Sequence, residues 1–122
     1  MSSSVSTTLE ATYRAYLDAI NARDWKKVAT YVSPRGTTHN GRSFTPDEYA
    51  NMCNVTSSPY QGITFTPERI IINSADDRNG ELFCRIRFDY TGSEEPFFEH
   101  VLYDWENGKI IRVLSIVEER TV

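Results

Sequence analysis

The fold is decided by the stretch FFEHVLYDWENGKIIRVLSIVEE, which runs from Phe97 to Glu119. Near its centre, Asn107-Gly108 separates two runs that are rich in aromatic and β-branched residues. Asn-Gly between such runs is the strongest short-range signal for a two-residue hairpin, because a type I′ turn needs a positive φ at both central positions. The stretch therefore predicts two antiparallel strands in which Glu106 lies opposite Lys109.

The turn also predicts which side chains share a face of the hairpin, if pairing continues without interruption. One face then carries Glu99, Val101, Tyr103, Trp105, Ile110, Arg112, Leu114 and Ile116. The other face carries Phe98, His100, Leu102, Asp104, Ile111, Val113, Ser115, Val117 and, one step further, Glu119. Both faces are largely apolar, so we expect one to be covered by helices and the other by a second subunit.

Length and composition restrict the classes of protein to which the chain can belong. At 122 residues, it is predicted to be a single domain, 1–122, in which 1–6 form a loose tail. A net charge of −4 disfavours nucleic acid and anionic membranes as partners. The chain has no apolar run long enough to span a membrane and no signal-peptide pattern at its start, so we expect a cytoplasmic location. Cys53 and Cys84 lack metal or redox spacing and are expected to be buried, reduced side chains.

Helical signals come first. Apolar side chains recur at helical spacing over about 7–22, behind a capping box that starts at Thr7. Asp24 is expected to cap a short second helix, which ends at Pro34. Thr45-Pro46-Asp47-Glu48 is another capping box, and it opens a third helix that is predicted to extend to about Asn54.

Strand signals occupy the rest of the chain. Residues 35–40 are predicted to form a short strand on which Arg35 and His39 share a face. A strand over 63–73 contains Pro67, which removes a ladder donor and suggests a bulge or bend. Residues 81–90 alternate between apolar and polar side chains. Helices followed by an antiparallel meander predict an α+β fold, with three N-terminal helices packed on a bent sheet.

Three short stretches in this order carry a family resemblance: YLDAINARDW at 16–25, residues 31–42 with His39-Asn40-Gly41-Arg42, and WENGKI at 105–110. Over nearly the whole chain, the layout resembles the nuclear-transport-factor-2-like superfamily, specifically its SnoaL-like and ketosteroid-isomerase-like branch. The resemblance implies a cone-shaped fold in which a strongly bent, mostly antiparallel sheet wraps a pocket roofed by the first helix. Many such proteins dimerise through the outer face of the sheet, so a homodimer is expected.

The same resemblance suggests which hairpin face lines the pocket, placing Phe98, His100, Leu102, Val113, Ser115 and Val117 inward. The steroid-isomerase branch has a carboxylic acid at the position matching His100, a general-base aspartate at the position matching His39 and a tyrosine at the position matching Tyr16. This sequence keeps the tyrosine but carries histidine at both carboxyl positions, which argues against dienone isomerisation by a carboxylate base. The scytalone-dehydratase branch also uses histidines and tyrosines, so dehydration or enolisation fits these side chains better.

The candidate catalytic residues are therefore His39, His100, Tyr16, Arg35 and Glu119. We expect His39 to remove a proton, and His100 and Tyr16 to stabilise or protonate the oxyanion that forms. Arg35 and Glu119, near the pocket mouth, would position the substrate. The expected substrate-binding residues are Tyr13, Phe88, Tyr90, Phe98, Leu102, Val113, Ser115 and Val117. No metal is expected, because the two histidines have no third ligand at a readable spacing.

The sequence thus predicts a cofactor-independent isomerase, cyclase or dehydratase that acts on a small, apolar, polyketide- or terpenoid-like metabolite. Three alternatives use the same pocket. One is epoxide opening or skeletal rearrangement, which needs the same paired acid and base. In another, the pocket only shapes a substrate that cyclises spontaneously, so no acid or base is essential. The last is a non-catalytic ligand-binding or dimerisation module in which both histidines are structural. Solvent access to His39 and His100 separates this last alternative from catalysis.

Overall fold

The computed structural model describes residues 8–74 and 76–118, and it confirms the α+β class. Within these residues the predicted elements occur in the predicted order, together with one further short strand, β2 (Arg42–Phe44), that was not predicted. They are α1 (Leu9–Asn21), α2 (Trp25–Thr30), β1 (Thr37–His39), β2 (Arg42–Phe44), α3 (Pro46–Ser57), β3 (Thr64–Asn73), β4 (Gly80–Asp89), β5 (Phe97–Glu106) and β6 (Lys109–Val117). None of the helices in this part of the chain has the length and apolar character that a membrane crossing requires.

The helices begin at residues whose side chains satisfy free backbone N–H groups. Thr8 caps α1 by accepting from the Ala11 N–H, so the cap is one residue later than predicted; Thr7 lies outside the described residues. Asp24 caps α2 as predicted. The reciprocal capping box of Thr45 and Glu48 opens α3, which continues three residues beyond the predicted end.

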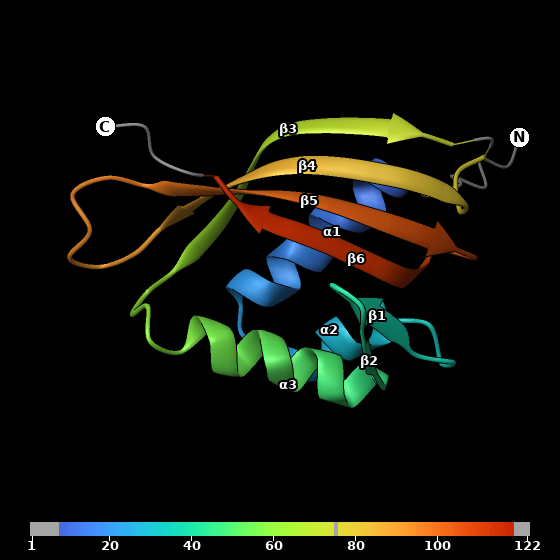
Figure 1. Cartoon of the computed structure of the whole chain (residues 1–122), viewed down its shortest axis with the longest axis horizontal. Coiled ribbons are helices and arrows are strands. Elements are labelled where there is room, and N and C mark those ends of the chain that lie inside the picture. The colour runs from blue at the N-terminus through green and yellow to red at the C-terminus, as the bar shows by residue number, and fades with distance from the viewer. Residues whose placement is uncertain (1–7, 75, 119–122) are drawn as a thin grey trace, which may run out of the picture.

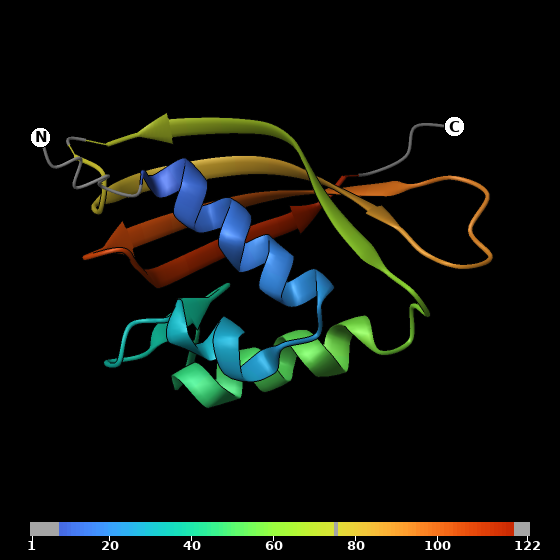
Figure 2. The same ribbon diagram turned by 180° about the vertical axis from the view of Figure 1, so that it is seen from behind.

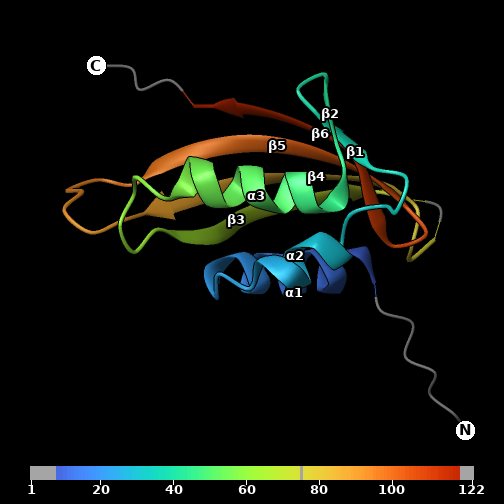
Figure 3. The same ribbon diagram turned by 90° about the horizontal axis from the view of Figure 1, so that it is seen from below.

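The sheet has the strand order β2-β1-β6-β5-β4-β3, and all its pairs are antiparallel except β1 with β6. Figure 2 shows α1 crossing the concave face of the sheet. Figure 3 shows α1 and α2 below the sheet and α3 in front of the strands, and α3 contacts α2. The opposite face, toward the viewer in Figure 1, carries no helix from the described residues. The predicted irregularity at Pro67 is confirmed, since the register shifts between Pro67 and Arg69.

The core lies between α1 and the concave face. One side of α1 buries Leu9, Tyr13, Tyr16, Leu17 and Ile20, which recur at helical spacing. They pack against the buried positions of β4, namely Leu82, Cys84, Ile86 and Phe88, as the alternation over 81–90 predicted. This arrangement leaves the wider end of the sheet, near α3, free to enclose a cavity.

The hairpin turn is confirmed, but its pairing is interrupted. Asn107 and Gly108 have φ values of 53° and 74°, as a type I′ turn requires. Glu106 lies opposite Lys109 and Trp105 opposite Ile110, yet the next pair is Asp104 with Arg112. Ile111 is therefore an extra residue, a β-bulge, and the prediction of an uninterrupted register is wrong.

Contacts on the other edge of β6 explain the bulge. The Ile110 backbone bonds to Tyr31 and Ser33, whereas His39 of β1 pairs with Val113. Ile110 and Val113 are both fully buried, although strict alternation would place residues three apart on opposite faces. The extra residue lets both side chains point into the core.

The bulge changes the composition of both hairpin faces. The concave face carries Glu99, Val101, Tyr103, Trp105, Ile110, Val113, Ser115 and Val117. The inward placement of Val113, Ser115 and Val117 is confirmed. The inward placement of Phe98, His100 and Leu102 is wrong, because β5 positions of that parity lie on the outer face.

Candidate active site

A cavity of about 290 Å³ lies between the concave face, α1 and α3. One part is lined by polar side chains from four different elements, namely Tyr16, His39, Tyr49, Cys53 and Ser115. Another part is lined by the aromatic rings of Tyr60, Phe65, Phe88 and Phe97. Glu99, two residues after Phe97 on β5, also lines the cavity. The cavity thus combines a polar wall that can handle a proton with an apolar wall that can hold a hydrocarbon skeleton.

His39, at the end of β1, belongs to the polar wall as predicted. Its Nε2 lies 3.2 Å from the Ser115 hydroxyl on β6. Asn40, which has a φ of 49°, locks the two strands together: its Oδ1 accepts from the Ser115 N–H at 2.8 Å and its Nδ2 donates to the Ser115 carbonyl at 3.2 Å. Partial burial lowers the pKa of His39 below its usual value, so the ring is neutral at physiological pH.

A pair of tyrosine hydroxyls stands beside His39. Tyr16 of α1 and Tyr49 of α3 are both buried, and their hydroxyl oxygens are 2.7 Å apart. The Tyr49 ring meets the His39 ring edge-on, with centroids 6.4 Å apart. Burial raises the pKa of both phenols well above 10.0, so they remain protonated hydrogen-bond donors. The predicted inward placement of Tyr16 is confirmed, and Tyr49 is an addition that the sequence reasoning missed.

Glu99 provides the carboxyl group of the cavity. It points inward from β5, opposite Val117. Its side chain is half-buried and has no hydrogen-bond or ion-pair partner among the described residues. Burial raises its pKa, which brings the carboxyl group closer to the range where it can take up and release a proton near neutral pH.

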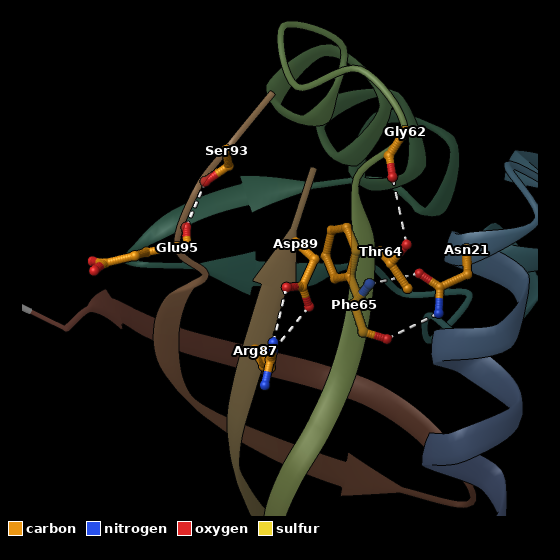
Figure 4. A network of polar contacts seen from close by, with 8 residues as sticks. All are labelled: Asn21, Gly62, Thr64, Phe65, Arg87, Asp89, Ser93 and Glu95. Atoms are coloured by element: carbon orange, nitrogen blue, oxygen red, sulfur yellow. Dashed lines mark hydrogen bonds and ion pairs between the residues drawn. The ribbon is translucent and has the colours of Figure 1, made fainter. Parts of the chain in front are cut away.

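The aromatic wall is built by strands whose inward residues stack on one another. Phe88 stacks on Phe97 at 4.7 Å and meets Phe65 edge-on at the same distance. Figure 4 shows Asn21, at the end of α1, facing the Phe65 backbone, which it bonds through both its oxygen and its nitrogen at 2.8 and 2.9 Å. This clamp fixes the start of β3 against α1, so the aromatic wall is held in place at its edge.

Two predicted binding residues lie behind the cavity wall. Tyr13 is fully buried against Tyr16 and Tyr103 and does not line the cavity. Tyr90 packs against Tyr60 and Phe97, also without reaching the lining. Phe88 lines the cavity as predicted.

The remaining candidates lie elsewhere. On the outer face, His100 Nε2 is 2.8 Å from Glu118 Oε1, and the other oxygen of Glu118 is 2.8 Å from Arg85. Phe98 lies beneath the Arg85 guanidinium, 3.7 Å from its carbon to the ring centroid. These contacts give His100 and Phe98 structural roles on the outer face, where Leu102 also lies opposite Leu114.

Arg35 does not join the cavity either. Arg35 is exposed in the turn before β1 and borders a separate depression, so the prediction that it shares the face of His39 is wrong. The Gly36 N–H donates to the Ser33 carbonyl and closes a tight turn. The strand therefore begins only at Thr37. Glu119 lies outside the described residues. Within them, no group of three or more acidic, His or Cys side chains could hold a metal ion.

Among the cavity residues that the sequence reasoning missed, Tyr49 and Glu99 are the most important for the chemistry, and they were missed for different reasons. The capping box at Thr45 predicted the helix that carries Tyr49, and Tyr49, Cys53 and Ser57 recur on one side of it, so a helical-spacing argument could have found Tyr49. Glu99 shares its face with Val101, Tyr103 and Trp105, which are buried, so the alternation along β5 could have found it. It was missed because an uninterrupted register places the inward face of Ser115 on the side of His100, and the bulge at Ile111 breaks that register.

Comparison with known proteins now adds the family. The SnoaL-like domain family matches residues 13–113 of the sequence. The chain belongs to this family. A SnoaL-like polyketide cyclase from Agrobacterium tumefaciens is 30% identical, and the match covers 93% of both chains with a TM-score of 0.79.

More distant structures share the fold of this SnoaL-like protein. An NTF2-like protein of unknown function from Cytophaga hutchinsonii has 12% identity and a TM-score of 0.69, over 92% of this chain and 91% of that one. A candidate ketosteroid isomerase from Kribbella flavida has 17% identity and a TM-score of 0.71, over 93% of this chain and 80% of that one. No functionally curated protein matches the sequence. The expected NTF2-like fold, with helices on a curled sheet, is thereby confirmed.

Proposed function

We propose that this SnoaL-like protein is a cofactor-independent acid/base catalyst, an isomerase, cyclase or dehydratase acting on a small metabolite. The observation that carries the proposal is the unpartnered carboxyl group of Glu99 in the same apolar cavity as a neutral His39. A half-buried carboxyl group without a partner is costly to the fold. Such a group is characteristic of sites where a side chain must exchange a proton with a ligand.

The tyrosine pair completes the chemistry. Within the Tyr16–Tyr49 pair one hydroxyl donates to the other, so the pair has one hydroxyl hydrogen left to donate to an oxygen on which negative charge develops when a carbon next to a carbonyl loses its proton. Proton removal and oxyanion stabilisation are the two operations shared by enolisation, aldol-type cyclisation and dehydration of a hydroxyketone. The Agrobacterium relative bears the name of a polyketide cyclase, which supports cyclisation among these reactions.

Charge and size limit the substrate. No Lys or Arg belongs to the cavity lining formed by the described residues, so an anionic substrate would meet Glu99 without a compensating charge. The cavity volume of about 290 Å³ is at the lower end of the range of about 300–1,000 Å³ for small-molecule pockets. A neutral, largely apolar carbonyl compound, no larger than a compact bicyclic molecule, fits these limits.

A homodimer through the outer face is part of the same proposal. Ile71 pairs with Phe83, Phe83 with Leu102 and Leu102 with Leu114, so an apolar row crosses four strands of this face. Ile71, in this row, is 49% exposed, and Ile116, two residues beyond Leu114, is 71% exposed. A contiguous apolar surface on a sheet face that no helix covers favours association. Sedimentation at a series of protein concentrations, with Ile116→Glu as the disrupting variant, tests the dimer separately from the activity.

The catalytic proposal is tested by metabolite profiling of a strain that lacks the gene and is complemented with variants. The wild type should consume a precursor that accumulates in the deletion strain. Glu99→Gln and His39→Gln should leave the precursor unconsumed, whereas His100→Gln, a matched change on the outer face, should rescue. Full rescue by folded Glu99→Gln and His39→Gln proteins would exclude acid/base catalysis and favour the ligand-binding module.

A further inference from the structure

We propose that Ser115 and Asn40 fix His39 as the Nδ1–H tautomer, so that His39 donates a hydrogen bond to the substrate oxygen and Glu99 is the base. This inference rests on the proposed function for its chemical meaning. It reverses the role expected from the sequence, in which His39 removes the proton. It also makes Ser115 and Asn40 positioning residues, which act on the reaction only through His39.

The donors and acceptors around the Ser115 hydroxyl determine the tautomer of His39. Asn40 Nδ2 lies 3.4 Å from this oxygen and can only donate to it. The other recorded partner of the hydroxyl is His39 Nε2, at 3.2 Å. Asn40 Oδ1, the other acceptor nearby, is engaged by the Ser115 N–H at 2.8 Å. If Nε2 carried a hydrogen, the oxygen would accept from both sides and its own hydrogen would have no acceptor among the recorded partners in the described residues.

The arrangement that satisfies every group has the Ser115 hydroxyl donating to Nε2. The hydrogen bond made at one ring nitrogen sets the protonation of the other. Neutral His39 then carries its hydrogen on Nδ1. In the described residues Nδ1 has no protein partner, and His39 lines the cavity. The free N–H is therefore available to a ligand.

In this assignment Glu99 and His39 have different roles in the reaction. Glu99 takes a proton from the carbon next to the substrate carbonyl, and the C–H electron pair becomes the enolate. The Nδ1–H of His39 and the tyrosine pair donate to the enolate oxygen. Return of the same proton from Glu99 to another carbon completes an isomerisation, and its transfer to a departing hydroxyl group completes a dehydration as water. Atoms and charge balance in both cases without a co-reactant.

The test is nitrogen-15 NMR of the two imidazole rings in the full-length protein, which reports directly which nitrogen carries hydrogen. His100→Gln assigns the His39 signals, because the chain has only two histidines. We expect wild-type His39 to have hydrogen on Nδ1. Ser115→Ala should shift the ring toward the Nε2–H tautomer, which free histidine prefers. Ser43→Ala, the same change at an exposed position of β2, should leave the tautomer as in the wild type.

Two results would overturn the inference: hydrogen on Nε2 in the wild type, or an unchanged tautomer in folded Ser115→Ala. Backbone amide shifts report folding, and the bonds from Asn40 to the Ser115 backbone remain in that variant. The measurement needs no substrate, so it is independent of the complementation result. Hydrogen on Nδ1 together with full rescue by Glu99→Gln, which removes the base, would refute the proposed function and leave the hydrogen-bond assignment standing.

Discussion

Replacing Glu99 by Gln should stabilise the protein at neutral and alkaline pH while it abolishes activity. The Glu99 carboxyl group is half-buried in the cavity, without a partner among the described residues, and burial raises its pKa. The folded protein therefore binds this proton more tightly than the unfolded chain does. The resulting stability is fully present below the unfolded pKa and is lost as the pH rises through the higher, folded pKa. Gln, which is neutral at every pH, avoids that loss.

The magnitude follows from the burial. An unsatisfied polar group that is fully buried costs about 1–3 kcal/mol, and the partial exposure of Glu99 places it at the lower end, about 1 kcal/mol. For a chain of this length, that corresponds to a rise in melting temperature of about 3–5 °C. The assay is thermal and urea unfolding at about pH 8 and about pH 4, on either side of the shifted titration of Glu99. Glu94→Gln, an exposed position in the loop before β5, is the matched control.

The stabilities of Glu99→Gln and of the wild type should differ at the higher pH. They should converge at the lower pH, where Glu99 is protonated and resembles Gln. A Glu99→Gln protein that is no more stable than the wild type at about pH 8 would refute the reasoning. Equal stabilisation at both pH values would refute it too, because the effect would then not depend on the charge. In either case the ionised Glu99 carboxylate would not destabilise the fold.

Three further perturbations test separate parts of the structure. Tyr16→Phe should lower the free energy of unfolding by about 1 kcal/mol, because the buried Tyr49 hydroxyl loses its hydrogen-bond partner. In a double-mutant cycle, additive effects of Tyr16→Phe and Tyr49→Phe would contradict the 2.7 Å hydrogen bond between them. Arg85 and His100 lower the pKa of Glu118 to about 2, so the stability it provides is present above the unfolded pKa and disappears as the pH falls through about 2. Glu118→Gln should flatten this acid dependence of unfolding, and an unchanged acid profile would argue against the ion pairs. Asn107→Ala should lower stability by about 1 kcal/mol because alanine resists a positive φ, whereas glycine at the same position should be tolerated; equal melting temperatures for the two variants would contradict the type I′ turn.

Features that depend on neighbouring residues could be predicted from the sequence. The Asn107-Gly108 turn, the capping box that opens α3 and the irregularity at Pro67 all follow from local backbone chemistry. The family resemblance supplied the arrangement of these parts and correctly placed His39 and Tyr16 in the cavity. Each of these signals requires only a few residues of context.

Features that depend on packing between distant segments could not be predicted. Ile111 bulges because β6 pairs on its far edge with segments before and after Pro34, a contact that no local pattern encodes. The bulge alters which β5 positions share a face with Ser115, so a face deduced from the turn places His100 inward instead of Glu99. A one-residue error in register exchanges all inward and outward side chains of a strand.

The parallel pairing of β1 with β6 has a consequence for how the protein is made. His39 and Asn40 are synthesised early, yet the partner that orients them, Ser115, lies 75 residues beyond Asn40. On the ribosome, β1 has no β6 to join until nearly all of the described chain has emerged, and such long-range pairing is intrinsically slow. The helices and the β3–β5 meander can form before that point, so the proton-handling wall of the cavity is the last part to be assembled. The wall that carries His39 and Ser115 therefore stays incomplete in any chain whose final strand has not docked.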